Sequence, residues 1–208
     1  MHVVIGATGH TGNVVAEKLL ANREKVRVVG RDERRLERFK QKGAEAFVGD
    51  VSDASAMARA FSGAEAAYLM LPPNISSPNV LAYQQRVSEA LAAALENNGV
   101  RHAVVLSSFG ADKADRTGPV VGLHTLEKRL DAIPGLNVLF IRAGYFMENI
   151  LPQVNVIPSV GSMAGPLRSD LALPMIATRD IGDFAAEARY RGGTFRASSG
   201  GISSARGT

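Results

Sequence analysis

Cysteine is absent from this sequence of 208 residues, and long apolar runs are absent as well. Without cysteine, disulfides and thiolate metal sites are excluded, which suits a reducing environment such as the cytoplasm. No apolar run approaches the roughly 20 residues that a membrane-spanning helix needs. The first residues, MHVVIGATG, lack the basic stretch, apolar region and cleavage site of a signal peptide. We therefore expect a cytoplasmic protein without a membrane partner.

Charge of one sign is in only small excess. The formal net charge is +4 and the pI is about 9.6, and much of the basic excess lies in residues 31–42, where acidic residues are interleaved. No aromatic RNA-binding motif and no paired zinc ligands accompany it, and no set of His, Asp and Glu has metal-ligand spacing. The pattern favours a solvated helix face with one ligand-facing arginine over a nucleic-acid surface, and it predicts no bound metal.

Strand and helix patterns alternate from the first residue. Hydrophobic residues make up 46% of the chain and charged residues 21%, as in ordinary globular domains. Short apolar runs predict strands over 2–6, 25–30, 45–48, 65–71, 101–107 and 136–142. Amphipathic spacing predicts helices over 11–22, 32–42, 54–62, 79–98 and 120–132. The alternation predicts an α/β fold with a doubly wound, mostly parallel sheet of the Rossmann type.

Residues at the starts of these helices are candidate caps. Asp32 precedes the second helix, and Ser52 or Asp53 precedes the third. After residue 143 several prolines interrupt the pattern, and 173–188 predicts a short extended piece followed by a helix that Asp180 caps.

The last residues differ in composition from the rest of the chain. Residues 189–208 contain few apolar side chains and many Gly, Ser and Arg, so we expect them to be loose. We therefore divide the chain into a Rossmann domain (1–143), a partial substrate-side region (144–188) and a loose or aberrant tail (189–208).

Three glycines lie between the first predicted strand and the first predicted helix: Gly6, Gly9 and Gly12. In this context the first permits a tight turn, the second lets the backbone approach a pyrophosphate, and the third lets the helix pack close to the strand. The N–H groups and positive dipole of the helix then favour phosphates. We predict a dinucleotide site here, against the alternative of a turn that binds nothing. Thr8, His10 and Thr11 are expected to contribute, although a solvent-facing position also explains His10.

The residues after the second strand indicate which dinucleotide binds. An NAD-selective site usually has a carboxylate at this position, which accepts from the ribose 2′-hydroxyl. Arg31 stands there instead, and its guanidinium suits a 2′-phosphate. Asp32 either caps the next helix or reaches the ribose. We therefore expect NADP as cofactor, with NAD as the alternative.

Two further strand ends are expected to line the cofactor. Asp50 and Val51 follow the third strand on the adenine side, although a helix-capping turn also explains Asp50. Leu71 and Pro72 end the fourth strand on the nicotinamide side, where the prolines also explain why a strand stops.

Five segments together resemble a known family. GATGHTG, VRVVGRD, GDVSD, LSSFGAD and IRAGYFMEN are similar to the NmrA-like group of atypical short-chain dehydrogenases/reductases, over about residues 1–188. That group includes quinone reductases and isoflavone-reductase-like enzymes. The resemblance implies a Rossmann domain with a smaller C-terminal substrate region, and NADP(H) or NAD(H) as cofactor. Some relatives reduce quinones or other small electrophiles, whereas others bind the cofactor without known turnover and act as redox-sensing regulators.

The Tyr-x-x-x-Lys pair of the wider superfamily is missing. In its place stand His124 and Lys128, four residues apart and hence on one helix face. His124 is therefore a candidate proton donor and Lys128 a candidate ligand of the nicotinamide ribose. The alternative is an ordinary exposed helix surface, as Glu127 and Lys128 also suggest. At the end of the fifth strand we assign Ser107 to cofactor contact and Ser108 to catalysis.

Aromatic and amide side chains follow the sixth strand. Tyr145 and Phe146 are expected to wall an aromatic substrate, and Asn149 to orient it, because ligands bind outside the carboxyl ends of such strands. Core packing of Phe146 and Met147 is the alternative. Arg142 closes the strand and is expected to pair with a carboxylate or a carbonyl.

The chain also departs from the group in its last residues. The resemblance implies a longer chain, whereas RYRGGTFRASSGGISSARGT changes composition abruptly, which we interpret as a truncation or a shifted reading frame. The predicted function is an NAD(P)H-dependent oxidoreductase whose small-molecule substrate is a quinone or carbonyl compound. Two alternatives stay open: a non-catalytic NAD(P)(H) sensor that signals through a protein partner, and a nucleotide-sugar epimerase-like enzyme.

Overall fold

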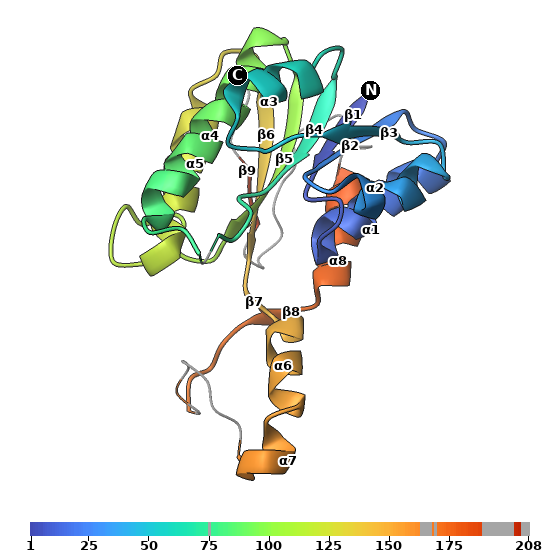
Figure 1. Ribbon diagram of the computed structural model, residues 1–208. Coiled ribbons are helices and arrows are strands. Elements are labelled where there is room, and N and C mark those ends of the chain that lie inside the picture. The colour runs from blue at the N-terminus through green and yellow to red at the C-terminus, as the bar shows by residue number, and fades with distance from the viewer. Residues whose placement is uncertain (75, 163–167, 169, 189–201, 205–208) are drawn as a thin grey trace.

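The computed structural model describes residues 1–74, 76–162, 168, 170–188 and 202–204, and its main body is a sheet with helices on both faces (Figure 1). The parallel strands are β1 (His2–Ile5), β2 (Val26–Gly30), β3 (Glu45–Val48), β4 (Ala66–Leu69), β5 (His102–Ser108) and β6 (Asn137–Ala143). Their order is β3-β2-β1-β4-β5-β6, which is the order of a Rossmann sheet. The predicted fold class is therefore confirmed.

Helices cover the two faces of the sheet in two groups. On one face pack α3 (Ala54–Ala60), α4 (Val80–Asn97) and α5 (Val121–Asp131). On the other pack α1 (His10–Ala21), α2 (Glu33–Lys40) and α8 (Thr178–Ala188). Because helices lie on both sides, the central strands are apolar on both faces, and all four residues of β1 and of β4 are buried. In β6, Phe140 faces the first group and Ile141 the second.

Three of these helices begin at residues whose side chains accept hydrogen bonds from the helix backbone. The caps of α2, α3 and α4 are Asp32, Asp53 and Asn79. The predicted capping role of Asp32 is confirmed, and Asp53 rather than Ser52 caps α3.

The predicted cap of α8 is wrong. The helix begins at Thr178, so Asp180 lies inside its first turn. The Glu148 carboxylate instead accepts from the N–H of Thr178 at 2.9 and 3.0 Å and from its hydroxyl at 2.7 Å. The capping carboxylate comes from a segment 30 residues away, which the local pattern around Asp180 does not reveal.

A narrow arm projects from the main body after β6 (Figure 1). It consists of β7 (Tyr145–Phe146), the 3₁₀ helix η2 (Met147–Ile150), α6 (Leu151–Val154) and α7 (Ile157–Val160), and it returns through β8 (Met175–Ile176). β8 pairs in parallel with β7, and α8 then leads the chain back to the main body. No helix within the described ranges is long and apolar enough to cross a membrane.

Part of the expected loose tail joins the sheet. β9 (Ile202–Ser204) pairs antiparallel with residues 139–141 of β6. At these three residues the structure differs from the expectation, because an edge strand offers unpaired backbone groups that a polar segment can also bind. The remainder of the tail, 189–201 and 205–208, lies outside the described residues.

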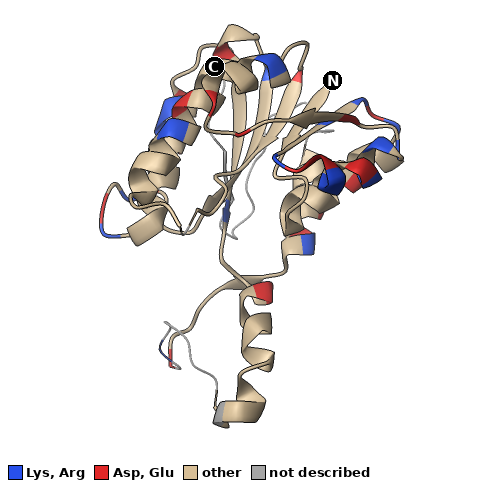
Figure 2. Cartoon of the chain, viewed as in Figure 1, with Lys and Arg blue, Asp and Glu red and all other residues tan. Residues whose placement is uncertain are grey.

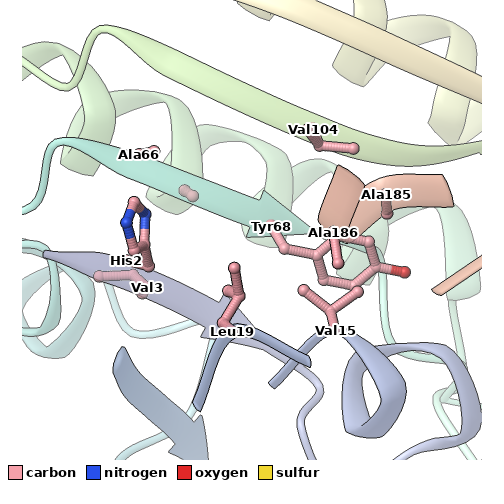
Figure 3. Close-up of a pocket in the computed structure, with 10 residues that line it drawn as sticks. His2, Val3, Val15, Leu19, Ala66, Tyr68, Val104, Ala185 and Ala186 are labelled. Carbon is pink, nitrogen blue, oxygen red and sulfur yellow. The ribbon is translucent and has the colours of Figure 1, made fainter. Parts of the chain in front are cut away.

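One small cavity lies between the sheet and the helices α1 and α8 (Figure 3). Tyr68 of β4, Val15 and Leu19 of α1, and Ala185 of α8 are among the residues that line it. Its volume is about 10 Å³, near the lower limit for a single water. A cavity of this size excludes a cofactor, so the candidate site lies elsewhere, at the carboxyl ends of the strands.

Candidate functional site

The turn between β1 and α1 requires glycine at several positions. Gly6 has a φ of +72°, in the left-handed region, and its carbonyl accepts from the N–H of Gly9 at 2.9 Å. A Cβ on residue 12 would lie 2.4 Å from the Gly6 oxygen, so Gly12 cannot be enlarged without moving the turn. The turn therefore folds back closely on the start of α1, and side chains are excluded from that space.

The first turn of α1 differs from those of its neighbours. Its N-cap is Gly9, which has no side chain to accept from the helix N–H groups, and its first turn contains no acidic residue. By contrast, α2, α3 and α4 each begin with a side-chain acceptor. The N–H groups and positive dipole of α1 are therefore available to an external anion, and the exposed turn suits a diphosphate.

The three polar residues of the turn are placed differently from one another. The Thr8 carbonyl accepts from the Arg35 guanidinium at 2.9 Å, and the side chain of His10 is exposed. Thr11 is buried, and its hydroxyl accepts from the Tyr68 hydroxyl at 2.9 Å. Burial raises the pKa of Tyr68, so this phenol remains a donor. Thr11 therefore faces the core with its side chain, and this bond anchors the start of α1.

Arg31 and Asp32 follow β2 with separate roles. The Asp32 carboxylate accepts from the Arg34 N–H at 2.9 Å and is committed to capping, whereas Arg31 is exposed at the strand end. Asp50 accepts from both the N–H and the hydroxyl of Ser52, at 2.8 and 2.7 Å. These hydrogen bonds lower the pKa of Asp50, and the nearby charge of Arg31 lowers it further. Arg31 and Asp50 thus share one region at the ends of β2 and β3.

The apolar residues expected beside the cofactor also contribute to packing. Val51 is buried in the core under α3 and α4, and Leu71 is half-buried against the same core. Pro72 is half-buried after β4, and Met70 approaches the turn so closely that a Cβ on Gly6 would lie 3.0 Å from its sulfur. These residues lie at the predicted strand ends, and core packing explains much of their burial.

Basic and acidic residues are interspersed along α2 and its neighbours (Figure 2). Lys40 pairs with Glu37 at 2.8 Å, and Lys42 pairs with Glu17 of α1 at 2.6 Å. The Arg38 guanidinium donates to the side-chain oxygen of Asn13 on α1 at 2.8 Å. Local ion pairs therefore offset part of the positive charge of this stretch, and the contacts of Lys42 and Arg38 tie the α2 segment to α1.

The candidate catalytic pair on α5 lines one cavity. His124 and Lys128 both border a cavity of about 330 Å³, which Asp112, Asp131 and Arg142 also line. The His124 Nδ1 lies 2.8 Å from the carbonyl oxygen of Ala111. Because a carbonyl only accepts, Nδ1 carries the hydrogen of that bond, and Nε2 is the ring atom at which a proton can be gained or lost.

Glu127 is buried, so the alternative that it lies on an ordinary exposed helix surface is wrong. Its residue exposure is 6%, and it accepts at 2.5 Å from the Ser107 hydroxyl, itself on a residue only 3% exposed. Arg142 donates to both its oxygens, from Nε at 3.0 Å and from Nη2 at 2.5 Å. The expected pairing of Arg142 with a carboxylate is confirmed. Its partner was missed because the segment HTLEKRL has the charged pattern of a surface helix.

The network changes what Ser107 can do at the site. Its hydroxyl proton is committed to Glu127, so it is not available to donate to a cofactor. Ser108 lies on the opposite side of β5 and is half-buried, with its hydroxyl donating to the Phe109 carbonyl at 3.2 Å. It does not border the His124 cavity.

The predicted substrate residues lie apart from that cavity. Tyr145 and Phe146 form β7, and Phe146 packs against the core on the α1 and α8 face. Asn149 is exposed on η2, and Met147 is 50% exposed, so core packing does not explain Met147. None of them borders the cavity beside His124.

Comparison with known proteins identifies the chain by its sequence and its fold. The model of the NmrA-like family matches residues 2–198. The chain belongs to the NmrA-like family. Proteins similar to it include a (4-alkanoyl-5-oxo-2,5-dihydrofuran-3-yl)methyl phosphate reductase of Streptomyces griseus, 30% identical over 181 residues, which are 87% of this chain.

Two solved structures share the fold. The triphenylmethane reductase of Citrobacter sp., complexed with NADP(H), has a TM-score of 0.79 and 17% identity, over 92% of this chain. The NADPH-dependent quinone oxidoreductase of Escherichia coli, complexed with NADPH, has a TM-score of 0.75 and 22% identity, over 93% of this chain. The chain spans 60% of the Streptomyces reductase and 66% of each solved structure.

Among the described residues, no group of three or more His, Asp or Glu side chains is placed to hold a metal ion.

Proposed function

We propose that this chain binds NADP(H) at the glycine turn and forms the cofactor-binding part of a reductase of small quinones or carbonyl compounds. The observation that carries the proposal is the start of α1. Gly9 leaves the helix N–H groups without a side-chain acceptor, and Gly12 lies where a Cβ would meet the Gly6 oxygen at 2.4 Å. This arrangement fits a diphosphate, because it places backbone donors and a helix dipole in a space without side chains.

The arginines after β2 support NADP over NAD. Asp32 caps α2 through one of its carboxylate oxygens, so capping by itself accounts for a carboxylate at this position. Arg31 is exposed at the strand end, and Arg35 is fixed by the Thr8 carbonyl beside the glycine turn. Guanidinium groups suit a 2′-phosphate better than a hydroxyl.

The residues on α5 support reduction as the chemistry. A bound nicotinamide supplies the hydride, and the protein supplies orientation and a proton. His124 would donate that proton from Nε2 of the doubly protonated ring, which leaves a neutral ring whose hydrogen stays on Nδ1 in the bond to Ala111. Lys128, which borders the same cavity, would contact the nicotinamide ribose. Ser108, Tyr145 and Asn149 lie outside the cavity beside His124, so they would contact only a part of the substrate that extends beyond it. The names of the relatives support this class, because they include a quinone oxidoreductase and two other reductases.

A second candidate function is a non-catalytic NADP(H) sensor. The absence of the superfamily tyrosine and the commitment of the Ser107 hydroxyl to Glu127 favour it. An epimerase-like activity is weaker, because the tyrosine base that such enzymes use is missing here.

One experiment separates these functions. The oxidation of NADPH is followed by its absorbance against a panel of quinones and aldehydes, and NADPH affinity is measured in parallel by calorimetry. Turnover with at least one substrate is expected for the reductase. Tight binding without any turnover would support the sensor instead, and no binding would contradict both.

A further inference from the structure

We infer that Glu127, held by Arg142 and Ser107, is a positioning residue that fixes His124 at the edge of the cavity of about 330 Å³ described above. The inference rests on the proposed role of His124 as proton donor and assigns a function to a buried carboxylate that the proposed chemistry does not use. Glu127 contacts neither substrate nor cofactor in this scheme. It acts through the helix that carries His124.

The network joins three elements at one point. Ser107 is the penultimate residue of β5, Arg142 is the penultimate residue of β6, and the two are direct partners in the register of these strands. Glu127 lies on α5 and accepts from both, so one carboxylate ties the helix to the ends of two strands. The position of α5 relative to the carboxyl edge of the sheet is therefore set by three hydrogen bonds rather than by apolar contact alone.

His124 lies one turn before Glu127 on the same helix. Its Nδ1 binds the Ala111 carbonyl at 2.8 Å, in the loop that follows β5. If α5 rotated or slid, this bond would lengthen and the ring would be free to exchange its tautomer. By fixing α5, Glu127 thus keeps the Nδ1 hydrogen in its bond to the Ala111 carbonyl and holds Nε2 in one position.

Stability alone does not account for the network. A buried ion pair contributes little net stability, because the cost of removing both charges from water offsets their attraction. Apolar side chains of similar size would hold α5 at least as firmly. The bidentate geometry of Arg142 on Glu127 instead specifies one orientation of the helix, which apolar contacts specify less strictly.

The charges around His124 are mixed in sign. From α5 itself come Glu127, Lys128 and Asp131, from the loop after β5 comes Asp112, and from β6 comes Arg142. On the far side of α5, Arg129 pairs with Glu89 and Glu96 of α4. Removing Glu127 and Arg142 together leaves the net charge around His124 unchanged, so an effect on His124 would reflect its position.

The test compares the loss of the network, which joins α5 to two strands, with the loss of an ion pair that joins α5 to one neighbouring helix. The variant S107A/E127L/R142L removes the network, and E96L/R129L removes an ion pair that joins α4 to the opposite side of the same helix. Nitrogen NMR of the imidazole rings reports the tautomer of the neutral His124 ring. The signals of His124 are identified among those of the four histidines as the ones that disappear in H124A. We expect a single Nδ1-protonated tautomer in the wild type and in E96L/R129L. We expect a mixture of tautomers in S107A/E127L/R142L.

Kinetics provide the second readout. With a carbonyl substrate, S107A/E127L/R142L is expected to lower kcat about tenfold to a hundredfold, with NADPH affinity changed less than the turnover. The same changes in an H124A background should have little further effect, because the histidine they position is gone. Losses that multiply in the combined variant would overturn the inference, since they would indicate a general effect on the fold.

The two readouts separate this inference from the proposed function. If the wild type binds NADPH but H124A keeps full activity, the catalytic role of His124 fails and this inference fails with it. If the wild type shows no turnover at all, the proposed reductase fails, and the tautomer measurement alone decides whether Glu127 positions His124. A fixed tautomer retained in S107A/E127L/R142L would overturn the positioning role. If that variant does not fold, S107A alone is used, with a smaller shift toward mixed tautomers expected.

Discussion

The hydroxyl of Tyr68, in the centre of the sheet on β4, donates to the hydroxyl of Thr11 in the first turn of α1 at 2.9 Å, and both residues are buried. One side chain from the core thus anchors the helix start that we assign to diphosphate binding. The hydrogen bond connects the stability of the fold to the geometry of the glycine turn.

This anchor predicts the effect of Tyr68→Phe. The substitution leaves the Thr11 hydroxyl buried without its donor, so we expect a loss of about 1–2 kcal/mol in the free energy of unfolding. NADPH affinity should also fall, because the first turn of α1 becomes less well held. Denaturant unfolding and calorimetry measure the two effects. The double variant Y68F/T11V removes both polar groups and should recover most of the stability; equal losses in both variants would contradict the role of this bond.

A second prediction concerns Gly12→Ala. Its Cβ would meet the Gly6 oxygen at 2.4 Å, so the turn must move and NADPH binding should be lost. Gly63→Ala is the matched control: residue 63 has a φ of +70° and open space around it, so alanine there costs stability through backbone strain alone. We expect Gly63→Ala to lower the melting temperature and to keep NADPH affinity. Calorimetry that shows similar binding losses in both would refute a specific role for the turn.

A third prediction separates the two cofactors. Arg31→Ala should weaken NADPH far more than NADH, because the guanidinium would contact the 2′-phosphate that NADH lacks. Arg34→Ala removes a neighbouring arginine whose side chain is 94% exposed, and it should change neither affinity appreciably. Titration of each variant with both nucleotides gives the ratio. Equal losses for NADPH and NADH in Arg31→Ala would exclude this assignment.

A fourth prediction concerns pH and the anchoring of the arm. Burial opposes ionisation of Glu148, but the hydrogen bonds from Thr178 outweigh it and lower the pKa of the Glu148 carboxyl below its ordinary value of 4.5. A lowered pKa in the folded state stabilises the protein above the unfolded pKa, and this contribution is lost as pH falls through the folded pKa. Glu148→Gln should therefore cost about 1 kcal/mol at neutral pH.

Unfolding curves at several pH values test this linkage. The difference between wild type and Glu148→Gln should shrink as pH falls below about 4.5 and vanish once the carboxyl is protonated. Asp170→Asn is a suitable control, because that carboxylate pairs only with Arg168 among the residues described and is exposed. A constant difference across the whole pH range would contradict the capping role.

Much of the fold could be predicted because its signals are local. The strand and helix ranges follow from short apolar runs and amphipathic spacing, and the Gly6, Gly9 and Gly12 spacing predicts the turn without knowledge of any distant residue. The capping roles of Asp32 and Asp53 are equally local, since each carboxylate accepts from N–H groups two or three residues further on.

The features that were missed depend on distant residues. Glu127 is buried because the register of β5 and β6 brings Ser107 and Arg142 together beneath it, and no pattern within HTLEKRL contains that information. Glu148 takes the capping place expected of Asp180 because the arm turns back to the start of α8. For the same reason the sequence predicted the pairing of Arg142 but could not name its partner.

The most direct test is calorimetric titration of the chain with NADPH, NADP⁺, NADH and NAD⁺, with melting temperature measured for each mixture. We predict saturable binding and a raised melting temperature, strongest with the two phosphorylated nucleotides and lost in Gly12→Ala. If none of the four nucleotides produces heat or a melting shift, the assignment of the β1–α1 turn to diphosphate binding is contradicted, and the proposed reductase function is contradicted with it.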